Sequence, residues 1–471
     1  TVSCAMGEAA GGDGVFDALV IGGGVVGCAV LRELAVEYGW SCVLVEQSPW
    51  LASGASSGNT GIACTPSDVD PGTLEHRCLV EGCRRNVDMY QRLGVPHQCT
   101  GSLYLAYTAE EADHLRREHA RREEAGEPVD LLDTCAILAI EPSANPAATC
   151  GLLVKGEVTV DPWLVPIAWA WNAQNNGARI DRRQRVVSAR FDHDAECWRV
   201  DAEGTDASPN CSNKRYAARA VICCGGLWGD QMEGLRGAPE RFKIQPRRGD
   251  FILFSDGSSE GHSAAPEVLT GGVPLGGVPT PVSRGVYVWR SALGVLACGP
   301  TAENVQERTT PPSATSQPVQ ASLEAAASLA VPGLGHKEVC GTYAGLRPGL
   351  SGSNRDYVIE ADDALPWFHI GGIRSTGLTA SLGIAAHASR LVGQRLGRMR
   401  DHAEASSSVT HTGNWTPLPD VAYLAESYWQ RGGDGTVDFG GEFGVHLVTH
   451  PLTRAGIARF SRRRRQQQQQ Q

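Results

Sequence analysis

The chain lacks the cysteine spacings of zinc ribbons, thioredoxins and ferredoxins. Its 15 cysteines include no C-x-x-C pair, and because 15 is an odd number they cannot all form disulfides. Cys223 and Cys224 are adjacent in an apolar run and are interpreted as small buried side chains. We therefore expect a reduced, intracellular protein without a metal site.

Long hydrophobic runs and an excess of positive charge are also missing. The most apolar stretch, 18–36, contains four glycines, Arg32 and Glu33, so no transmembrane segment is expected. The formal net charge of −10 gives no reason to expect nucleic acid or an anionic membrane as a partner, and any anionic substrate would have to be bound by local arginines. The first residue is Thr1, and the expected compartment is the cytoplasm or the mitochondrion.

Glycine, in contrast, is abundant, and its clearest pattern lies near the start of the chain. Residues 17–46 read DALVIGGGVVGCAVLRELAVEYGWSCVLVE. A buried strand is expected over 18–21, a helix over 25–38 and a second strand over 42–45. Between the first strand and the helix, three glycines form G-x-G-x-x-G: Gly22, Gly24 and Gly27. They predict a tight turn, a close backbone approach to a pyrophosphate and close helix packing.

Glu46 ends the second strand, 19 residues after Gly27. An acidic residue there binds ribose hydroxyls, which favours FAD or NAD over NADP. The helix that begins at Val25 directs its N–H groups and positive dipole end toward the phosphates. A glycine-rich turn without a ligand is the alternative, but strand, glycines, helix, strand and acid occur here in the order that the motif requires.

Two further segments have the composition of cofactor-binding loops. Residues 53–61, SGASSGNTG, offer hydroxyls and backbone N–H groups, and their alternative interpretation is an ordinary flexible loop. A strand over 367–370 is followed by Gly371, Gly372 and a helix over about 379–396, which repeats the strand–glycine–helix order. Residues 137–156 and 270–281 are expected to be mostly loop.

These segments resemble the FAD-dependent oxidoreductases related to D-amino-acid oxidase. The chain is most similar to the branch that contains glycerol-3-phosphate dehydrogenases and L-2-hydroxyglutarate oxidases. The resemblance covers about residues 17–390. It rests on an ordered set of motifs: VIGGGVVGCAVLREL with Glu46, SGASSGNTG, VTVDP, VICCGGLWGD, PRRGDF, YAGLRPG and GIRSTGLTASLGIA.

The resemblance implies an α/β (α+β) fold, with a Rossmann-like FAD-binding domain interleaved with a mixed-sheet substrate domain. The FAD-binding domain would comprise 14–100, 151–236 and 340–400, and the substrate domain 101–150 and 237–339. Residues 1–13 would be a disordered lead-in. Residues 401–471 would be an extension with a disordered Arg/Gln tail.

The resemblance also assigns cofactor-binding residues. Gly22, Gly24, Gly27 and Glu46 would bind the ADP half of FAD. Ser57, Asn59 and Thr60 would line the pyrophosphate and ribityl, and the Val187 backbone would meet the adenine. The remaining residues would close the site or lie beside the flavin pyrimidine: Gly225, Gly226, Trp228, Gly372, Thr376, Gly377 and Leu378.

Arg347, in GLRP, matches the arginine that relatives use to bind a substrate carboxylate or phosphate, and a guanidinium fork suits such an anion. Its alternative is a structural salt bridge. Arg374 is the second candidate, and Tyr343 is expected to share the pocket. Arg247 and Arg248 are weaker candidates. No histidine is identified as the base, although His262, His336 and His369 are available.

Two departures from relatives stand out. Cys64 occupies the position where the hydroxyglutarate-oxidase branch has histidine. It is interpreted as a buried thiol, with covalent attachment to FAD as the alternative. No cysteine follows residue 400, so the appended iron–sulfur domain of some relatives is absent from this stretch.

The sequence thus predicts an FAD-dependent oxidoreductase that oxidises a small anionic 2-hydroxyacid or glycerol 3-phosphate by hydride transfer to flavin N5. Oxygen, a quinone or an electron-transfer protein would accept the electrons. The alternatives are an amine or amino-acid oxidase of the glycine or sarcosine type, a non-catalytic flavin-binding protein and a soluble NAD-dependent dehydrogenase. The last is disfavoured because a nicotinamide enzyme does not need the GIRSTGLT segment.

Overall fold

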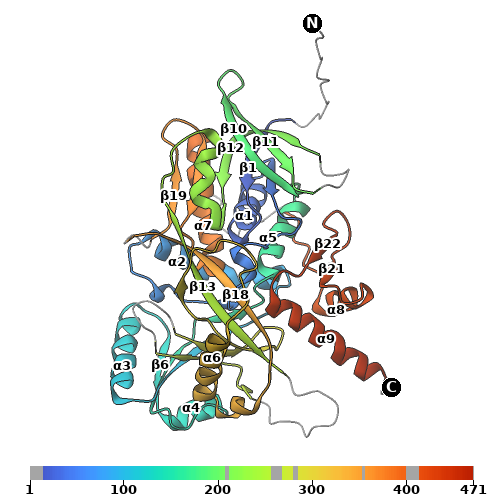
Figure 1. Ribbon diagram of the computed structural model, residues 1–471. Coiled ribbons are helices and arrows are strands. Elements are labelled where there is room, and N and C mark those ends of the chain that lie inside the picture. The colour runs from blue at the N-terminus through green and yellow to red at the C-terminus, as the bar shows by residue number, and fades with distance from the viewer. Residues whose placement is uncertain are drawn as a thin grey trace.

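The computed structural model describes residues 14–206, 212–255, 268–278, 285–352, 356–398 and 413–469. Over these ranges the chain builds two large sheets with helices packed against them (Figure 1). The expected lead-in, 1–13, lies outside the described residues. No helix within these ranges is long and apolar enough to span a bilayer.

The first sheet contains the glycine motif. Its strand order is β10-β11-β12-β1-β2-β9, with β20 also beside β12 and β19 beside β20. The strands β9, β2, β1, β12 and β20 run parallel, while β10 and β11 form an antiparallel hairpin. The strands are β1 (Phe16–Ile21), β2 (Cys42–Glu46), β9 (Arg179–Arg182), β10 (Gln184–Asp192), β11 (Cys197–Gly204), β12 (Lys214–Cys223), β19 (Val358–Ala361) and β20 (Trp367–Gly371).

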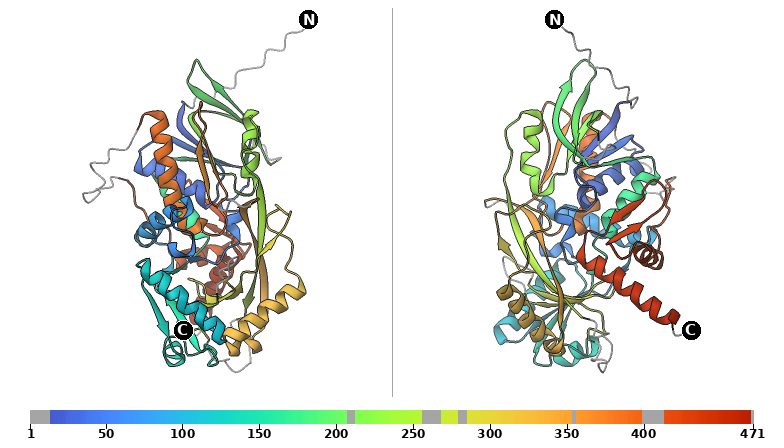
Figure 2. Two further views of the ribbon diagram at one scale, coloured as in Figure 1. Left: turned by 90° about the vertical axis from the view of Figure 1, so that its left-hand side faces the viewer. Right: turned by 45° about the vertical axis from the view of Figure 1, so that its right-hand side comes forward.

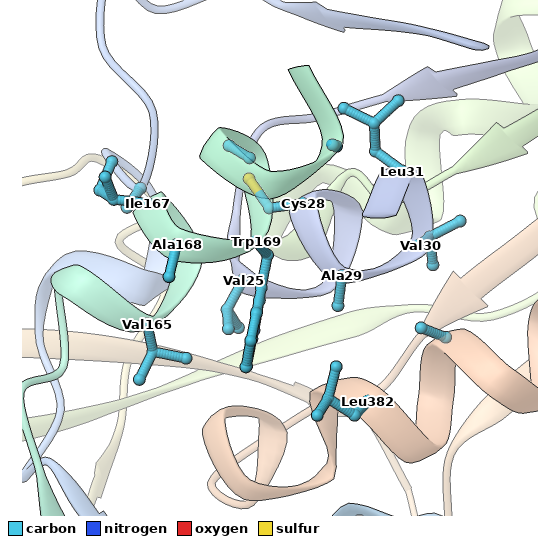
Figure 3. Packing of buried hydrophobic residues seen from close by; sticks show 14 of the residues in the cluster. Val25, Cys28, Ala29, Val30, Leu31, Val165, Ile167, Ala168, Trp169 and Leu382 are labelled. Carbon is cyan, nitrogen blue, oxygen red and sulfur yellow. The ribbon is translucent and has the colours of Figure 1, made fainter. Parts of the chain in front are cut away.

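The helix after β1 is buried on nearly every side. It runs as α1 (Val25–Arg32) and continues as a π-helical turn, η1 (Glu33–Glu37). Its apolar side chains pack against α5 (Leu164–Asn175) and against Leu382 of α7 (Gly377–Leu396), as Figure 3 shows. α5 is itself buried over most of its length, which explains why its sequence is mostly apolar.

α7 also packs closely against α2 (Leu74–Arg92). A Cβ on Gly82 would lie 2.2 Å from the Thr379 carbonyl oxygen, and one on Gly383 would lie 2.0 Å from the Cys78 carbonyl oxygen. These two glycines therefore allow the helix backbones to touch. The contact fixes the start of α7, where the second glycine-rich turn ends.

The second sheet has the order β17-β13-β16-β15-β14-β5-β7-β6, with β18 also beside β13. Its strands are β5 (Ser102–Ala106), β6 (Val129–Leu132), β7 (Cys150–Val154), β13 (Ile244–Phe254), β14 (Leu275–Gly277), β15 (Tyr287–Arg290), β16 (Leu296–Gly299), β17 (Glu303–Asn304) and β18 (Val339–Leu350). The helices of this half are α3 (Ala109–Glu124), α4 (Thr134–Ile140), α6 (Gln317–Ala330) and η5 (Pro332–His336).

Several expectations for this region need correction. The boundaries at 151 and 340 cut through β7 and β18, which both pair within the second sheet. The expected loop over 137–156 contains most of α4 and all of β7. The expected loop over 270–281 contains β14. The division into two domains stays a prediction.

The remaining elements are short or belong to the last part of the chain. They are β3 (Ile62–Ala63), β4 (His97–Gln98), β8 (Val158–Val160), η2 (Ala55–Ser57), η3 (Pro66–Asp68), η4 (Gly226–Arg236), α8 (Val421–Gln430), β21 (Thr436–Asp438), β22 (Val445–Leu447) and α9 (Pro451–Gln469). The tail expected to be disordered continues α9 as far as Gln469, and this helix projects from the body (Figure 2). Ser461 and Arg464 bond to α8 carbonyls, which contributes to holding α9.

The α2–α7 contact gives a first prediction. Gly383→Ala should lower the free energy of unfolding by about 2–3 kcal/mol, the cost of overpacking a close-packed site. Gly234→Ala is the control, because a Cβ there meets nothing within 4 Å. Urea unfolding measures both, and equal stability of the two variants would contradict the close packing.

Candidate active site

The glycine motif adopts the turn that its spacing predicts. Gly22 has a φ of +106°, and a Cβ on it would lie 2.5 Å from the Cys224 carbonyl oxygen. A Cβ on Gly27 would lie 1.9 Å from the Gly22 carbonyl oxygen. Gly24 is the N-cap of α1. The start of α1 is therefore pressed against the ends of β1 and β12, which a larger residue at 22 or 27 would prevent.

Glu46 turns back toward this motif. Its carboxylate accepts hydrogen bonds from the Gly23 N–H at 2.6 Å and the Ser48 N–H at 2.7 Å. Burial raises the pKa of Glu46, and these two hydrogen bonds oppose that shift. The acid thus lies at the glycine turn, where the ribose-binding role requires it.

A loop over 52–61 covers the start of α1. Ser56 Oγ accepts the Val25 N–H at 3.0 Å, a contact that the sequence did not single out. The neighbouring Ser57, which was expected to bind the cofactor, donates instead to the Gly54 carbonyl oxygen. Asn59 and Thr60 both face the main cavity. Hydroxyl composition marked this loop but could not say which serine reaches the helix.

This loop touches the second sheet at one point. A Cβ on Gly345 would lie 1.8 Å from the Gly58 carbonyl oxygen, and one on Gly58 would lie 2.5 Å from Gly345 Cα. Tyr343 donates its hydroxyl to the Asn59 carbonyl oxygen at 3.0 Å. The loop and β18 are thus in backbone contact, and a cavity opens beside this contact.

The cavity has a volume of about 430 Å³. It is lined by groups from the loop, from the turn that precedes α7 and from the second sheet. The polar side chains that line it are Asn59, Thr60, Gln245, Arg247, Tyr287, Asn304, Arg347, Ser351, Arg374, Ser375 and Thr376. None of the described lining residues is a carboxylic acid or a histidine.

Arg347 lies on the face of β18 that points to the cavity. Its guanidinium donates to the Arg248 carbonyl oxygen at 3.3 Å and to the Thr301 carbonyl oxygen at 3.4 Å. A Cβ on Gly249 would lie 2.5 Å from its Nη2, so the guanidinium rests over that glycine. Burial and, to a smaller extent, the charge of Arg247 lower the pKa of Arg347 to about 10, and Asp250 opposes the shift. Within the described ranges no carboxylate forms an ion pair with Arg347.

Arg247 and Arg248 lie on opposite faces of β13. Arg247 is paired across the ladder with Arg347 and lines the cavity. Arg248 is buried, and its guanidinium is 2.7 Å from Asp250 and 3.4 Å from Glu307. The alternation of a strand explains the difference. Arg247 therefore belongs to the candidate site and Arg248 to the structural ion pairs.

Arg374, expected beside the flavin, is held by a buried acid from α2. Its Nη2 is 2.7 Å from Glu75, and Glu75 also accepts the Thr376 hydroxyl at 2.5 Å. Tyr357 lies 2.5 Å from the same Thr376 oxygen. The Arg374 Nε is buried without a hydrogen-bond partner among the described residues. Glu75 therefore organises the start of α7, although its sequence context carries no recognisable signal.

Tyr343 lies one layer behind the cavity. Its ring stacks on Phe251 at a centroid distance of 4.4 Å, and Phe251 lines the cavity. Burial raises the pKa of Tyr343 well above its usual value. The geometry gives this tyrosine the task of holding Asn59 and Phe251 rather than that of exchanging a proton.

The other expected cofactor residues lie around the first sheet. Val187 falls in a β-bulge, where the pairing between β10 and β11 skips it. Trp228 is 40% exposed and lies under the Arg308 guanidinium. Gly225 and Gly226 follow β12, Gly372 has a φ of +70°, and Gly377 and Leu378 start α7. Their roles stay predictions.

Of the histidines named above, the two that the structure describes, His336 and His369, do not line the cavity. His336 is exposed on η5, His369 is buried 2.5 Å from Glu233, and His262 lies outside the described residues. Cys64 is buried, with its Sγ 3.6 Å from the Thr379 hydroxyl, and it is not a lining residue either. Covalent attachment of a flavin to Cys64 gains no support from this position.

Comparison with known proteins agrees with these features. Residues 17–391 match the DAO family, described as FAD dependent oxidoreductase. A glycerol 3-phosphate oxidase of Mycoplasma pneumoniae is 28% identical over 388 residues, which is 81% of this chain and 95% of that protein. A mitochondrial L-2-hydroxyglutarate dehydrogenase of Caenorhabditis briggsae is 26% identical over 51% of this chain and 54% of its own length.

Solved structures show the same fold. A dithionite-reduced L-α-glycerophosphate oxidase from Mycoplasma pneumoniae with FAD bound has a TM-score of 0.69 and 26% identity, covering 81% of this chain and 95% of that one. A glycine oxidase from Geobacillus kaustophilus has a TM-score of 0.67 and 22% identity, with the same coverage.

The residues of the site fit FAD. Gly22 and Gly27 leave no Cβ where the turn is tightest, and Glu46 lies at the turn. The start of α7 and the unpartnered Arg374 Nε lie at the cavity, where they can donate to polar atoms of the flavin. Gly22, Gly24, Gly27 and Glu46 would hold the ADP half, and Asn59, Thr60 and Thr376 the flavin half.

The Glu75 pair gives a second prediction. Glu75→Gln keeps the shape but removes the charge that Arg374 and Thr376 share. It should lower the free energy of unfolding by about 1–3 kcal/mol, the cost of leaving buried polar partners unsatisfied. Asp88→Asn, on the same helix but in an exposed pair with Arg92, should change it by less than about 0.5 kcal/mol. Urea unfolding followed by tryptophan fluorescence separates the two, and a silent Glu75→Gln would refute the organising role.

Proposed function

The chain belongs to the DAO family of FAD-dependent oxidoreductases, and we propose that it oxidises a small anionic alcohol of the glycerol 3-phosphate or 2-hydroxyacid type. FAD, when bound, supplies the two-electron acceptor for the hydride that leaves the donor carbon. The protein then has to bind the anionic end of the donor, orient its C–H bond and exclude water.

Arg347 carries this proposal. Among the described residues the partly buried guanidinium of Arg347 bonds to backbone carbonyl oxygens and to no carboxylate, and a cation that is partly desolvated in this way is stabilised when an anion joins it. The guanidinium fork of Arg347 matches a carboxylate or phosphate. Arg247, on the same face, increases the positive potential there.

Arg374 has a different role because Glu75 already neutralises it. The Nε of Arg374 has no hydrogen-bond partner among the described residues, so its N–H can donate to the flavin or to the hydroxyl of the substrate. Phe251 and Tyr287 are buried and form the apolar part of the wall, which excludes water from the reacting carbon. An anion at Arg347 would thus place the rest of a small donor toward Thr376 and Ser375.

The second candidate is an amino-acid oxidase of the glycine or sarcosine type, as the fold of the glycine oxidase suggests. A carboxylate would satisfy Arg347 equally well. The described lining residues include three arginines and no carboxylate, however. Glu75 already neutralises Arg374, so it is the positive charge of Arg347 that favours a donor with a net negative charge over a zwitterion.

Anaerobic titration of the purified protein decides between the candidates. Glycerol 3-phosphate, L-2-hydroxyglutarate, glycine and sarcosine would be added in turn while flavin absorbance is followed. Bleaching by glycerol 3-phosphate or L-2-hydroxyglutarate supports the proposal. Bleaching only by glycine or sarcosine supports the second candidate instead. A coloured protein that no donor bleaches would refute both.

Substitution of Arg347 gives a third prediction. Arg347→Gln should raise the KM of the bleaching donor about 100-fold, because charge-assisted hydrogen bonds worth about 2–3 kcal/mol are lost. Arg347→Lys keeps the charge but loses the forked guanidinium, so its KM should lie between those of the wild type and Arg347→Gln. Arg84→Gln, at an exposed position, is the control. Steady-state kinetics measure KM, and an unchanged KM with normal flavin content would disprove the anchor.

Gly249, which lies beneath the Arg347 guanidinium, gives a fourth prediction. Gly249→Ala would place a methyl group 2.5 Å from Nη2 and displace the guanidinium, so KM should rise about tenfold. Gly341→Ala, in the partner strand, has its nearest atom at 3.9 Å and should leave KM unchanged. A similar KM in both variants would show that the placement of Arg347 does not depend on Gly249.

A further inference from the structure

The segment 413–469 lies beyond residue 391, where the family match ends. It is nevertheless attached to helix α5 by hydrogen bonds. The Asn414 carbonyl oxygen accepts from the amides of Asn172 and Asn176 at 2.8 and 2.9 Å. The Thr416 carbonyl oxygen accepts the Trp171 indole N–H at 2.9 Å. All three donors belong to α5 or follow it directly, so the segment is anchored beside that helix (Figure 1).

Thr449, His450 and the first three residues of α9, together called the turn 449–453, reach the loop of the candidate site. Thr449 donates its hydroxyl to the Ala52 carbonyl oxygen at 2.9 Å. His450 Nε2 accepts the Asn59 N–H at 3.1 Å. Thr453 donates its hydroxyl to Asp161, the acid that caps α5, at 3.0 Å. The turn thus contacts the loop at both ends and the strand region behind it.

The peptide of Asn59 is held from two sides. His450 binds its N–H, and on the other side Tyr343 donates to its carbonyl oxygen at 3.0 Å. The two rings also meet edge to face at 5.5 Å. His450 is fully buried, and burial lowers its pKa to about 3, so the imidazole stays neutral with one lone pair. The Leu452 N–H lies 3.2 Å from Nδ1, and the bond from Asn59 uses the tautomer that carries its proton on Nδ1 and accepts at Nε2.

The loop between these contacts determines the shape of the FAD site. Ser56 reaches the first N–H of α1, and Asn59 lines the cavity. A shift of the Asn59 peptide would change both the start of α1 and the cavity wall. We propose that the turn 449–453 is a clamp that holds the loop 52–59 in its FAD-binding shape, with His450 as its positioning residue.

Binding of FAD to the full-length protein tests the clamp. His450→Phe removes the acceptor and leaves the Asn59 N–H unpaired in a buried place, so the Kd for FAD should rise about tenfold. His450→Gln offers a carbonyl oxygen at a similar reach and should stay within about threefold of wild type. His446→Phe is the matched control, because His446 is buried in the same segment but contacts Phe443 and Arg182 instead.

Quenching of FAD fluorescence on binding gives the Kd, and the visible absorbance of the bound flavin reports its surroundings. Equal Kd values for His450→Phe and His446→Phe, or no rescue by glutamine, would overturn the clamp. No donor is added in these measurements, so the result is independent of the substrate proposal.

Hydrogen exchange of the wild-type protein supplies a second test, which needs no variant to fold. Coupling between two sites is reciprocal, so a turn that favours FAD binding must be stabilised by FAD. The backbone amides of Thr449, His450, Leu452 and Thr453 should exchange several-fold more slowly in the FAD-loaded protein than in the stripped one. Exchange that is the same in both states would overturn the proposal even if the variants could not be purified.

Discussion

The backbone contact between Gly58 and Gly345 is the constraint on which the candidate site depends. The loop that covers the cofactor helix and the strand that carries Arg347 meet there with no room for a Cβ on either glycine. Side chains alternate along a strand, so the contact at Gly345 places Tyr343 and Arg347 on the same face, one on each side of it. Tyr343 then fixes Asn59, and Arg347 faces the cavity.

The guanidinium of Arg347 forms no ion pair with a carboxylate among the described residues, which is unusual in a chain whose formal net charge is −10. Other buried arginines of the protein have acids beside them: Arg32 has Glu37, Arg122 has Asp68 and Arg248 has Asp250. Arg347 is partly buried, and among the described residues it bonds to carbonyl oxygens and to no carboxylate, while desolvation lowers its pKa. An anionic ligand that restored the balance would raise that pKa and be held more tightly for the same reason.

Local patterns in the sequence predicted the parts of the site that are built locally. The glycine turn, Glu46 and the helix after β20 follow from spacing alone, because each depends on neighbours within about one strand–helix unit. The family resemblance supplied Arg347 and Arg374. The pairing of Glu75 with Arg374 joins residues 299 positions apart, and that of His450 with Asn59 joins residues 391 apart, so no local pattern could reveal them.

The mistaken expectations have the same physical origin. The Arg/Gln tail has a composition that is typical of disorder, but its first part is the continuation of a helix whose earlier turns pack on α8. The loop expected over 137–156 contains most of α4, a helix that depends on the Asp133 cap, and a strand that depends on its neighbours in the sheet. Composition predicts the structure of a segment in isolation. These segments instead adopt their secondary structure because they pack against neighbouring strands and helices. The same reasoning applies to the clamp: a turn of ordinary composition acquires a role at the cofactor loop only because α5 anchors the segment that carries it.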